Sequence, residues 1–116
     1  MISKVRFAPS PTGYLHIGGL RTALYNYLYA KKVEGKIILR IEDTDQSRQV
    51  ENAVEKLIST FDQIGIEFDE GPKLDGDYNL YFQSQRLDIY QQHIEILIKN
   101  GDAYPCFCSS SKLEGV

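Results

Sequence analysis

The chain has no tryptophan, a single methionine and only two cysteines among its 116 residues. It also has no apolar run near the roughly 20 residues that span a bilayer, which argues against a membrane-spanning helix. The first ten residues carry neither an apolar segment long enough for a secretory signal nor an arginine-rich transit pattern. We therefore expect a cytoplasmic protein without a membrane partner.

Positive charge is scarce as well. Lys and Arg number 13 against 16 Asp and Glu, so the formal net charge is −3 and no global basic field indicates nucleic-acid binding. Contact with RNA would need a local patch or a further part of the protein. Hydrophobic residues make up 42% and charged residues 25% of the chain, ordinary values that exclude disordered and fibrous classes. The length corresponds to one domain or a part of one.

The first 41 residues predict a strand, a helix and a second strand. Residues 4–8 (KVRFA) form a short strand ended by Pro9 and Pro11. Apolar residues recur at helical spacing from Ile17 onward, and Gly35 supplies a stop. Residues 36–41 (KIILRI) are typical of a strand covered on both faces. This order predicts an α/β fold built on a parallel βαβ unit with a right-handed crossover.

Two more helices are expected downstream. An apolar stripe over 50–64, closed by Gly65, predicts the first of them. Residues 69–82 are rich in Gly, Asp and Pro and predict a surface excursion. Ser84 or Gln85 then opens a helix that ends at 100–101 (NG), residues 103–108 look extended, and the last residues begin another helix. We expect the chain to end in the middle of a larger architecture.

Two loops follow the carboxyl ends of the predicted strands, where open parallel sheets bind ligands. Together with the first strand they supply a cation, carboxylates, hydroxyls and a glycine-rich helix start: Arg6, Ser10, Thr12, His16, Gly18, Gly19, Glu42, Asp43 and Asp45. The order of strands and loops predicts that Arg6, His16 and Glu42 converge on one cleft.

Each of these groups has a chemical use. The helix that begins near Ile17 offers free N–H groups and a positive dipole end to a phosphate, and its glycines let a flat adenine or ribose approach the backbone. His16 can donate a hydrogen bond to a phosphoryl oxygen that gains charge in a transition state. Arg6 can bind a carboxylate bidentately and Glu42 can bind an ammonium group, so a zwitterionic amino acid fits best.

Plainer interpretations exist for several of these residues. A histidine in a loop often has no special role, and Asp45 following a strand is typical of a helix N-cap. Residues 43–45 (DTD) could bind a metal ion, although no further carboxylate cluster supports this. His93 lies within the last long predicted helix and is expected at the surface.

Several segments in order resemble bacterial-type glutamyl-tRNA synthetases, which are class I enzymes with a Rossmann-like catalytic domain. They are RFAPSPTGYLHIGGLRTALYNYLYA (6–30), LRIEDTDQSR (39–48), DEGP (69–72) and QSQRLDIYQQHIEIL (83–97). HIGG (16–19) is similar to the class I signature, with Gly19 in place of its final histidine.

The resemblance implies a function and a role for each matching residue. Glutamate and ATP would form glutamyl-adenylate, and the glutamyl group would pass to tRNA-Glu, with Mg2+ accompanying ATP. Arg6, Ala8, Ser10 and Glu42 would line the glutamate pocket. The nucleotide site would comprise Pro9, Ser10, Pro11, Thr12, His16, Gly18 and Gly19, of which His16, Gly18 and Gly19 would be the catalytic positions.

Cys106 and Cys108 match the first half of a zinc knuckle found in many of these enzymes. Tetrahedral zinc takes four ligands, so the pair could hold Zn2+ only as a half-site. By themselves, two thiols this close make a poor structural disulfide and are reduced thiols or part of a metal site.

The resemblance also implies an N-terminal fragment of a longer, monomeric enzyme. Residues 1–102 would form the first half of the Rossmann-like domain, and 103–116 the start of the inserted acceptor-binding and zinc region. No lysine-rich second signature is present, so we expect the fragment alone to be inactive. The alternatives are a glutamyl-queuosine tRNA-Asp synthetase, a glutaminyl-tRNA synthetase and a non-catalytic nucleotide-binding module.

Overall fold

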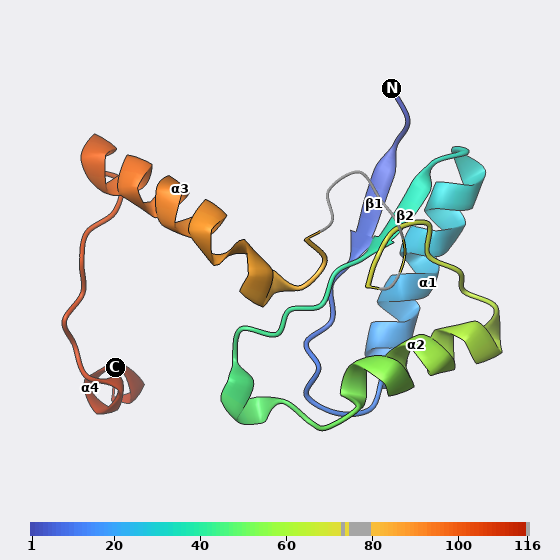
Figure 1. Ribbon diagram of the computed structural model, residues 1–116, viewed down its shortest axis with the longest axis horizontal. Helices are drawn as coiled ribbons and strands as arrows, with labels where there is room; N and C mark the ends of the chain where they lie inside the picture. Colours follow the sequence, from blue (N-terminus) through green and yellow to red (C-terminus); the bar gives the residue numbers. More distant parts are fainter. Residues whose placement is uncertain (73, 75–79, 116) are drawn as a thin grey trace. The chain divides into compact units, whose positions relative to one another are not determined.

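The computed structural model describes residues 1–72, 74 and 80–115. The chain forms two compact units, Met1–Arg86 and Leu87–Val116, and Figure 1 shows the elements of each. Over the described residues, no helix has the length and apolar character needed to cross a membrane. The domain boundary expected after residue 102 stays a prediction.

A parallel pair of strands organises the first unit. β1 (Lys4–Phe7) pairs with β2 (Lys36–Leu39), with Arg6 opposite Ile38. α1 (Ile17–Lys32) connects the two strands, and Figure 1 shows it lying against them. The parallel βαβ unit predicted from the sequence is therefore confirmed.

Gly35 contributes to this pairing through its size. α1 stops at Lys32, and the left-handed residue after it is Glu34 (φ 51°). A Cβ at Gly35 would overlap the carbonyl oxygen of Ser3, which accepts a hydrogen bond from the Lys36 N–H (2.8 Å). Gly35 thus allows the first backbone hydrogen bond between the two strands to form.

β2 is hydrogen-bonded on both sides. On the side away from β1, the Leu39 N–H donates to the carbonyl of Glu70 (2.9 Å) and the Ile41 N–H to that of Tyr81 (2.8 Å). The surface excursion expected over 69–82 is therefore wrong at both ends, where Glu70, Gly71, Pro72 and Tyr81 are buried. Its middle, 73 and 75–79, lies outside the described residues.

The core lies between the sheet and the two helices of the first unit. Phe61 on α2 (Ala53–Ile64) packs edge-on against Phe7 and Phe68, at centroid distances of 5.6 and 5.1 Å. The remaining buried members of the cluster are Ala23, Leu39, Ile41, Leu57 and Ile66.

The ends of α2 differ in how well the sequence predicts them. The helix ends at Gly65, which adopts the expected left-handed conformation (φ 75°). It begins at Ala53 rather than at Val50, because Asn52 is left-handed (φ 57°) and the Val50 N–H donates to the Pro11 carbonyl instead (3.1 Å).

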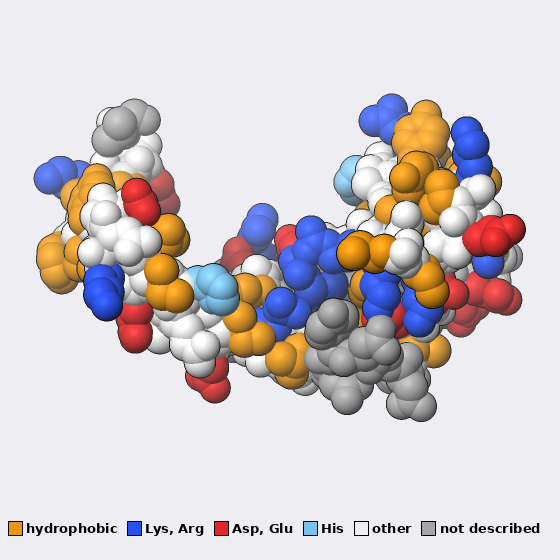
Figure 2. Space-filling model, turned by 90° about the horizontal axis from the view of Figure 1, so that it is seen from above, with side chains coloured by type: hydrophobic (Ala, Val, Ile, Leu, Met, Phe, Trp, Pro, Cys, Tyr) orange, Lys and Arg blue, Asp and Glu red, His pale blue; other side chains and the backbone are white. Residues whose placement is uncertain are grey.

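The second unit consists of α3 (Leu87–Asn100) and α4 (Ser110–Glu114), with no strand over 103–108. A 3-10 turn, η2 (Gln83–Arg86), precedes α3, and Gly101 (φ 82°) follows it as the NG pair predicts. Hydrophobic side chains reach the surface of the molecule (Figure 2). On α3 the exposed ones are Leu87, Ile94, Ile96, Leu97 and Ile98.

Candidate functional site

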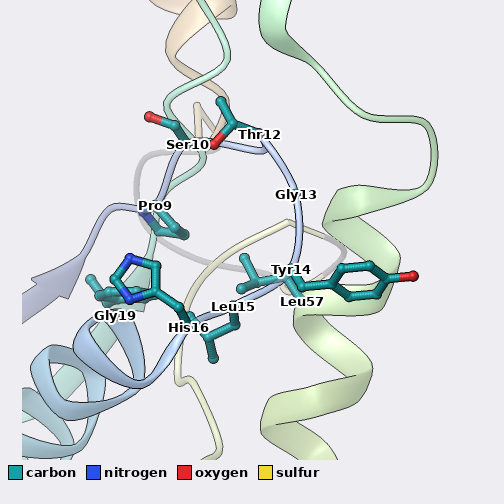
Figure 3. Close-up of a pocket in the computed structure, with 10 residues that line it drawn as sticks. Pro9, Ser10, Thr12, Gly13, Tyr14, Leu15, His16, Gly19 and Leu57 are labelled. Atoms are coloured by element: carbon teal, nitrogen blue, oxygen red, sulfur yellow. The ribbon is translucent and has the colours of Figure 1, made fainter.

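The loop between β1 and α1 curls around a pocket of about 450 Å³. Figure 3 shows the loop side chains around it. Most of the lining belongs to the predicted nucleotide segment, and Leu57 adds a contribution from α2. The lining residues are Phe7, Pro9, Ser10, Thr12, Gly13, Tyr14, Leu15, His16, Gly19 and Leu57.

Backbone hydrogen bonds join this loop to the segment after β2. The N–H of Arg40 donates to the carbonyl of Phe7 (3.0 Å), and that of Glu42 to the carbonyl of Pro9 (2.9 Å). The parallel ladder thus continues past the end of both strands. It brings the two loops predicted from the sequence side by side at one edge of the sheet, as the ligand-binding position of an open parallel sheet requires.

His16 is the N-cap of α1. Its backbone is extended (φ −97°, ψ 166°), and its Nδ1 accepts a hydrogen bond from the Gly18 N–H (3.1 Å). An Nδ1 that accepts has no proton, so in the neutral ring the proton is on Nε2. The cap therefore leaves an N–H donor at the rim of the pocket, beside the positive end of the helix.

The two glycines after His16 are needed for different contacts. A Cβ at Gly18 would lie 2.9 Å from Cε1 and 3.1 Å from Nδ1 of the imidazole, so a larger residue would push the ring out of its capping position. A Cβ at Gly19 would lie 2.9 Å from Leu15 Cδ1, and Gly19 itself lines the pocket. Gly18 and Pro11 are not among the lining residues.

Arg6 lies on the other face of the sheet from the core. Strand alternation sends Phe7 toward the core and Arg6 away from it. Arg6 lines a second pocket of about 250 Å³ together with two further arginines, Arg40 and Arg86; the other lining residues are Ile38, Leu80 and Tyr81.

Glu42 lies beside this arginine pocket. One of its carboxylate oxygens is 3.4 Å from Nη2 of Arg40. The residues expected in one cleft are therefore divided: His16 lines the loop pocket, Arg6 lines the arginine pocket, and Glu42 pairs with a residue of the latter. Their convergence on a shared ligand stays a prediction.

The two aspartates of the DTD segment are occupied by structural hydrogen bonds. Asp43 accepts from both the N–H (2.8 Å) and the hydroxyl (2.7 Å) of Ser84 at the start of η2. Asp45 accepts from the Ser47 hydroxyl and from Nε of Arg48, both at 2.6 Å. These two interactions, the serine first, lower the pKa of the Asp45 carboxyl.

No complete metal site forms around either candidate group. Cys106 and Cys108 are exposed free thiols, and a backbone hydrogen bond from Cys108, followed by a side-chain one, lowers the pKa of Cys106. Over the part of the chain that the structure describes, no three His, Cys, Asp or Glu side chains lie close enough to hold an ion. Two thiols do not fit the four-ligand requirement of structural zinc.

His93 is exposed on α3, as expected, with Nδ1 2.8 Å from the Ile89 carbonyl.

Sequence reasoning missed several residues that line the two pockets, among them Arg40, Arg86, Tyr14 and Leu57. Arg40 follows Arg6 at the same face by the alternation of paired strands, a signal that the sequence does contain. Arg86 and Leu57 come from segments whose spatial position only the fold defines, whereas Tyr14 lies in the predicted nucleotide segment between Thr12 and His16.

Comparisons with known proteins agree with this geometry. A family described as "tRNA synthetases class I (E and Q), catalytic domain" matches residues 3–116. The chain is 59% identical over 111 residues to a glutamate–tRNA ligase of Chlorobaculum parvum, covering 96% of this chain and 22% of the relative. It is 54% identical over 121 residues to a glutamate–tRNA ligase of Clostridioides difficile, covering 97% and 24%.

Solved structures give the same result. The crystal structure of a glutamate-tRNA synthetase from Elizabethkingia anophelis superposes with a TM-score of 0.93 at 48% identity, covering 99% of this chain and 23% of that one. A glutamate tRNA ligase from Elizabethkingia meningosepticum, solved in complex with its amino acid, gives a TM-score of 0.90 at 49% identity, covering 97% and 22%. The chain thus spans about a fifth to a quarter of the relatives it matches. The predicted Rossmann-like fold is confirmed, and the chain belongs to the catalytic-domain family of the class I tRNA synthetases for glutamate and glutamine.

Proposed function

We propose that this chain supplies the glutamate- and ATP-binding part of a glutamate–tRNA ligase. The reaction joins glutamate to ATP as glutamyl-adenylate with release of pyrophosphate, and the glutamyl group then passes to the terminal adenosine of tRNA-Glu. One observation carries the proposal: relatives named glutamate–tRNA ligase are 54–59% identical to nearly the whole chain. We also propose that the full-length protein is monomeric and lies in the cytoplasm.

The pocket at the start of α1 is the proposed ATP site. Its volume of about 450 Å³ falls in the range of small-molecule sites, roughly 300–1,000 Å³. The Nε2–H of His16 and the free N–H groups of the first helical turn would donate to phosphate oxygens. Attack of a carboxylate on the α-phosphorus needs alignment and charge stabilisation rather than a protein nucleophile, and fixed donors of this kind supply both. Pro9, Ser10, Pro11 and Thr12 would shape the rest of the site.

The amino acid would bind next to it, at the edge where the two loops are hydrogen-bonded. Arg6 would bind a carboxylate and Glu42 the ammonium group, with Ala8 and Ser10 between them. Arg40 lines the pocket of Arg6 and also pairs with Glu42. A bound ammonium group would therefore compete with Arg40 for Glu42. The guanidinium of Arg40 would then be released to bind the substrate carboxylate.

Magnesium needs no dedicated cage in this proposal. Mg2+ is usually held by substrate phosphates, water and one or two carboxylates, so it would enter with ATP. Zinc does not fit the described residues as a complete site, and we derive no step through it.

The alternative functions are less well supported. Relatives named glutamate–tRNA ligase favour the ligase over a glutamyl-queuosine tRNA-Asp synthetase and over a non-catalytic nucleotide module. The PSPTG loop and the GGLRTAL helix start favour it over the queuosine and glutaminyl enzymes on sequence grounds.

The test is glutamylation of tRNA-Glu by a longer protein that contains this chain. We expect [14C]glutamate to be attached to tRNA-Glu in an ATP-dependent manner. Arg6→Gln should raise the KM for glutamate more than that for ATP, whereas His16→Asn should mainly lower kcat. The matched control Lys32→Gln, on the far end of α1, should change neither. Charging of tRNA-Asp instead of tRNA-Glu would overturn the assignment.

A further inference from the structure

Asp43 is the residue after Glu42, and its carboxylate binds a serine that lies 41 residues further along the chain. One carboxylate oxygen accepts a hydrogen bond from the backbone N–H of Ser84 (2.8 Å), and the other accepts one from the Ser84 hydroxyl (2.7 Å). Hydrogen bonds to an ionised acceptor are stronger than those between neutral groups. Asp43 therefore fixes both the backbone and the side chain of Ser84.

Ser84 belongs to η2, the 3-10 turn that ends with Arg86. Arg86 lines the arginine pocket together with Arg6 and Arg40, and its Nη1 donates to the carbonyl of Leu80 (3.4 Å). A single 3-10 turn has poor hydrogen-bond geometry and little stability of its own. The place of Arg86 in the pocket therefore depends on what holds the turn.

Backbone hydrogen bonds attach the residues before the turn to the segment after β2. The Ile41 N–H donates to the carbonyl of Tyr81, and the Gln83 N–H donates to the carbonyl of Ile41, both at 2.8 Å. Asp43 continues this attachment into the turn itself, to the residue two positions before Arg86. The turn is thus fixed to the loop after β2, which is one of the two loops at the proposed ligand-binding edge of the sheet.

Electrostatic repulsion is the reason why this attachment matters. The guanidinium groups of Arg6, Arg40 and Arg86 line one pocket of about 250 Å³, and like charges gathered in a small pocket repel each other. An arginine side chain has many rotamers, so a turn that was free to move would let Arg86 point away from the other two. Holding the turn keeps the charge in place before a ligand binds, and preorganisation of this kind lowers the cost of binding an anion.

We propose that Asp43 is a positioning residue for the amino acid substrate: by holding Ser84, it keeps the guanidinium of Arg86 in the arginine pocket, ready for a carboxylate. This role rests on the proposed function and deepens it, because Asp43 contacts no ligand and acts on the affinity for glutamate through Arg86. One short segment then supplies two parts of the site, since Glu42 would bind the ammonium group and the next residue would hold a carboxylate-binding arginine.

Glutamylation of tRNA-Glu by a longer protein that contains this chain tests the role, with the KM for glutamate and the KM for ATP measured separately. Asp43→Ala should raise the KM for glutamate by about three- to tenfold, as expected for residues coupled in one hydrogen-bond network, and leave the KM for ATP unchanged. Asp43→Asn keeps one acceptor oxygen and should restore part of the loss. The matched controls are Asp62→Ala and Ser59→Ala at exposed positions of α2, which should change neither KM.

A double-mutant cycle separates positioning from a general structural role. Arg86→Gln should itself raise the KM for glutamate. Adding Asp43→Ala to Arg86→Gln should raise it no further, because Asp43 acts through the arginine that is already absent. Two effects that multiply would show that Asp43 acts by another route.

An unchanged KM for glutamate in Asp43→Ala or in Arg86→Gln overturns the proposal, and so does an equal rise in both KM values. If Arg6→Gln raises the KM for glutamate in that case, the amino acid site stands without Asp43. If no glutamate is attached to tRNA-Glu at all, the proposed function fails and the role of Asp43 fails with it. Should circular dichroism show that Asp43→Ala does not fold, Ser84→Ala in the parent and in the Arg86→Gln background gives the same decision.

Discussion

At the scale of single residues, the imidazole of His16 caps α1, because its Nδ1 accepts a hydrogen bond from the Gly18 N–H. In the proposed function, the proton on Nε2 would make the same ring a donor to phosphate. The sequence allowed His16 to be selected because of its place before two glycines, but it did not show the capping bond, since histidine is not a common N-cap residue. The division of Arg6 and His16 between two pockets was missed, because both were placed at the same end of the sheet without regard to the alternation of strand faces, which sends Arg6 away from the core.

The two roles of His16 can be separated by substitution. Asparagine is a good N-cap residue without the Nε2 donor, so His16→Asn should leave stability within about 0.5 kcal/mol of the parent. His16→Ala removes the cap and should cost about 1 kcal/mol. Both variants should lose affinity for tripolyphosphate. Urea unfolding and calorimetry are the measurements, and equal stability of the two variants would contradict the capping role.

Gly18→Ala should displace the His16 ring without changing the histidine itself. The new Cβ would lie 2.9 Å from Cε1 of His16, so the ring has to move and its hydrogen bond to the residue-18 N–H is lost. We expect affinity for tripolyphosphate to fall severalfold although alanine is the better helix former. The chemical shift of His16 Nδ1 in 15N spectra reports the bond directly. Gly115→Ala, whose Cβ would have its nearest neighbour at 3.6 Å, is the control.

The lowered pKa of the Asp45 carboxyl leads us to expect a local pH effect. Its pKa is lowered by Ser47 and Arg48, so the carboxylate stabilises the turn above the ordinary aspartate pKa and this contribution disappears as the pH falls through the lowered value. Because the side chain is exposed, the effect should appear in the turn and not in global stability. A 13C titration of the carboxyl in the parent and in Arg48→Gln tests it. The pKa should rise in the variant, and an unchanged value would rule out the ion pair.

At the scale of elements, the sequence predicts best what local patterns determine. The first strand was predicted over 4–8 and is found over 4–7. Like the start of α1 at Ile17 and the end of α2 at Gly65, it follows from proline stops, apolar spacing and glycine caps. The prediction of a surface excursion after α2 was wrong because the burial of that segment depends on its pairing with β2. A charged sequence such as DEGP is typical of a surface segment, since glutamate is rarely buried unless it is paired.

Glu70 shows what that pairing requires. Its side chain is 1% exposed, and its carboxylate accepts from Lys4 (2.8 Å) and the Tyr81 hydroxyl (3.1 Å) and lies 3.6 Å from Lys36. It therefore ties together β1, β2 and the segment on the other edge of β2. Replacing a buried charge partner leaves the others uncompensated, although both lysines here reach solvent.

Substitution of Glu70 should accordingly be costly. Glu70→Ala should destabilise the chain by about 2–3 kcal/mol, toward the lower end for buried charge partners because the lysines can hydrate. Glu70→Gln keeps the volume and an acceptor for Tyr81, so a smaller loss is expected. Urea unfolding measures both. Glu67→Gln, at an exposed position nearby, should change stability by less than about 0.5 kcal/mol.

At the scale of the whole molecule, the proposed site is one part of a larger one. In the proposal, the loop pocket supplies donors for phosphate and the arginine pocket supplies cations for a carboxylate, but the family members that this chain matches are four to five times longer. Catalysis of adenylate formation depends on holding two substrates and a leaving group in line, and effective molarity is lost when one side of the site is open.

We therefore expect the purified 116-residue chain to bind ATP weakly and to show negligible glutamylation of tRNA-Glu, whereas a longer protein that contains it is active. Binding without turnover follows because the donors at His16 belong to the chain, while closure over the nucleotide and contact with tRNA require further residues. Filter-bound [14C]glutamyl-tRNA measures the activity, and calorimetry with ATP measures the binding. His16→Asn in the longer protein should lower kcat by about tenfold or more, as expected for loss of a donor to developing charge. Measurable charging by the 116-residue chain would show that the two pockets already form a complete site.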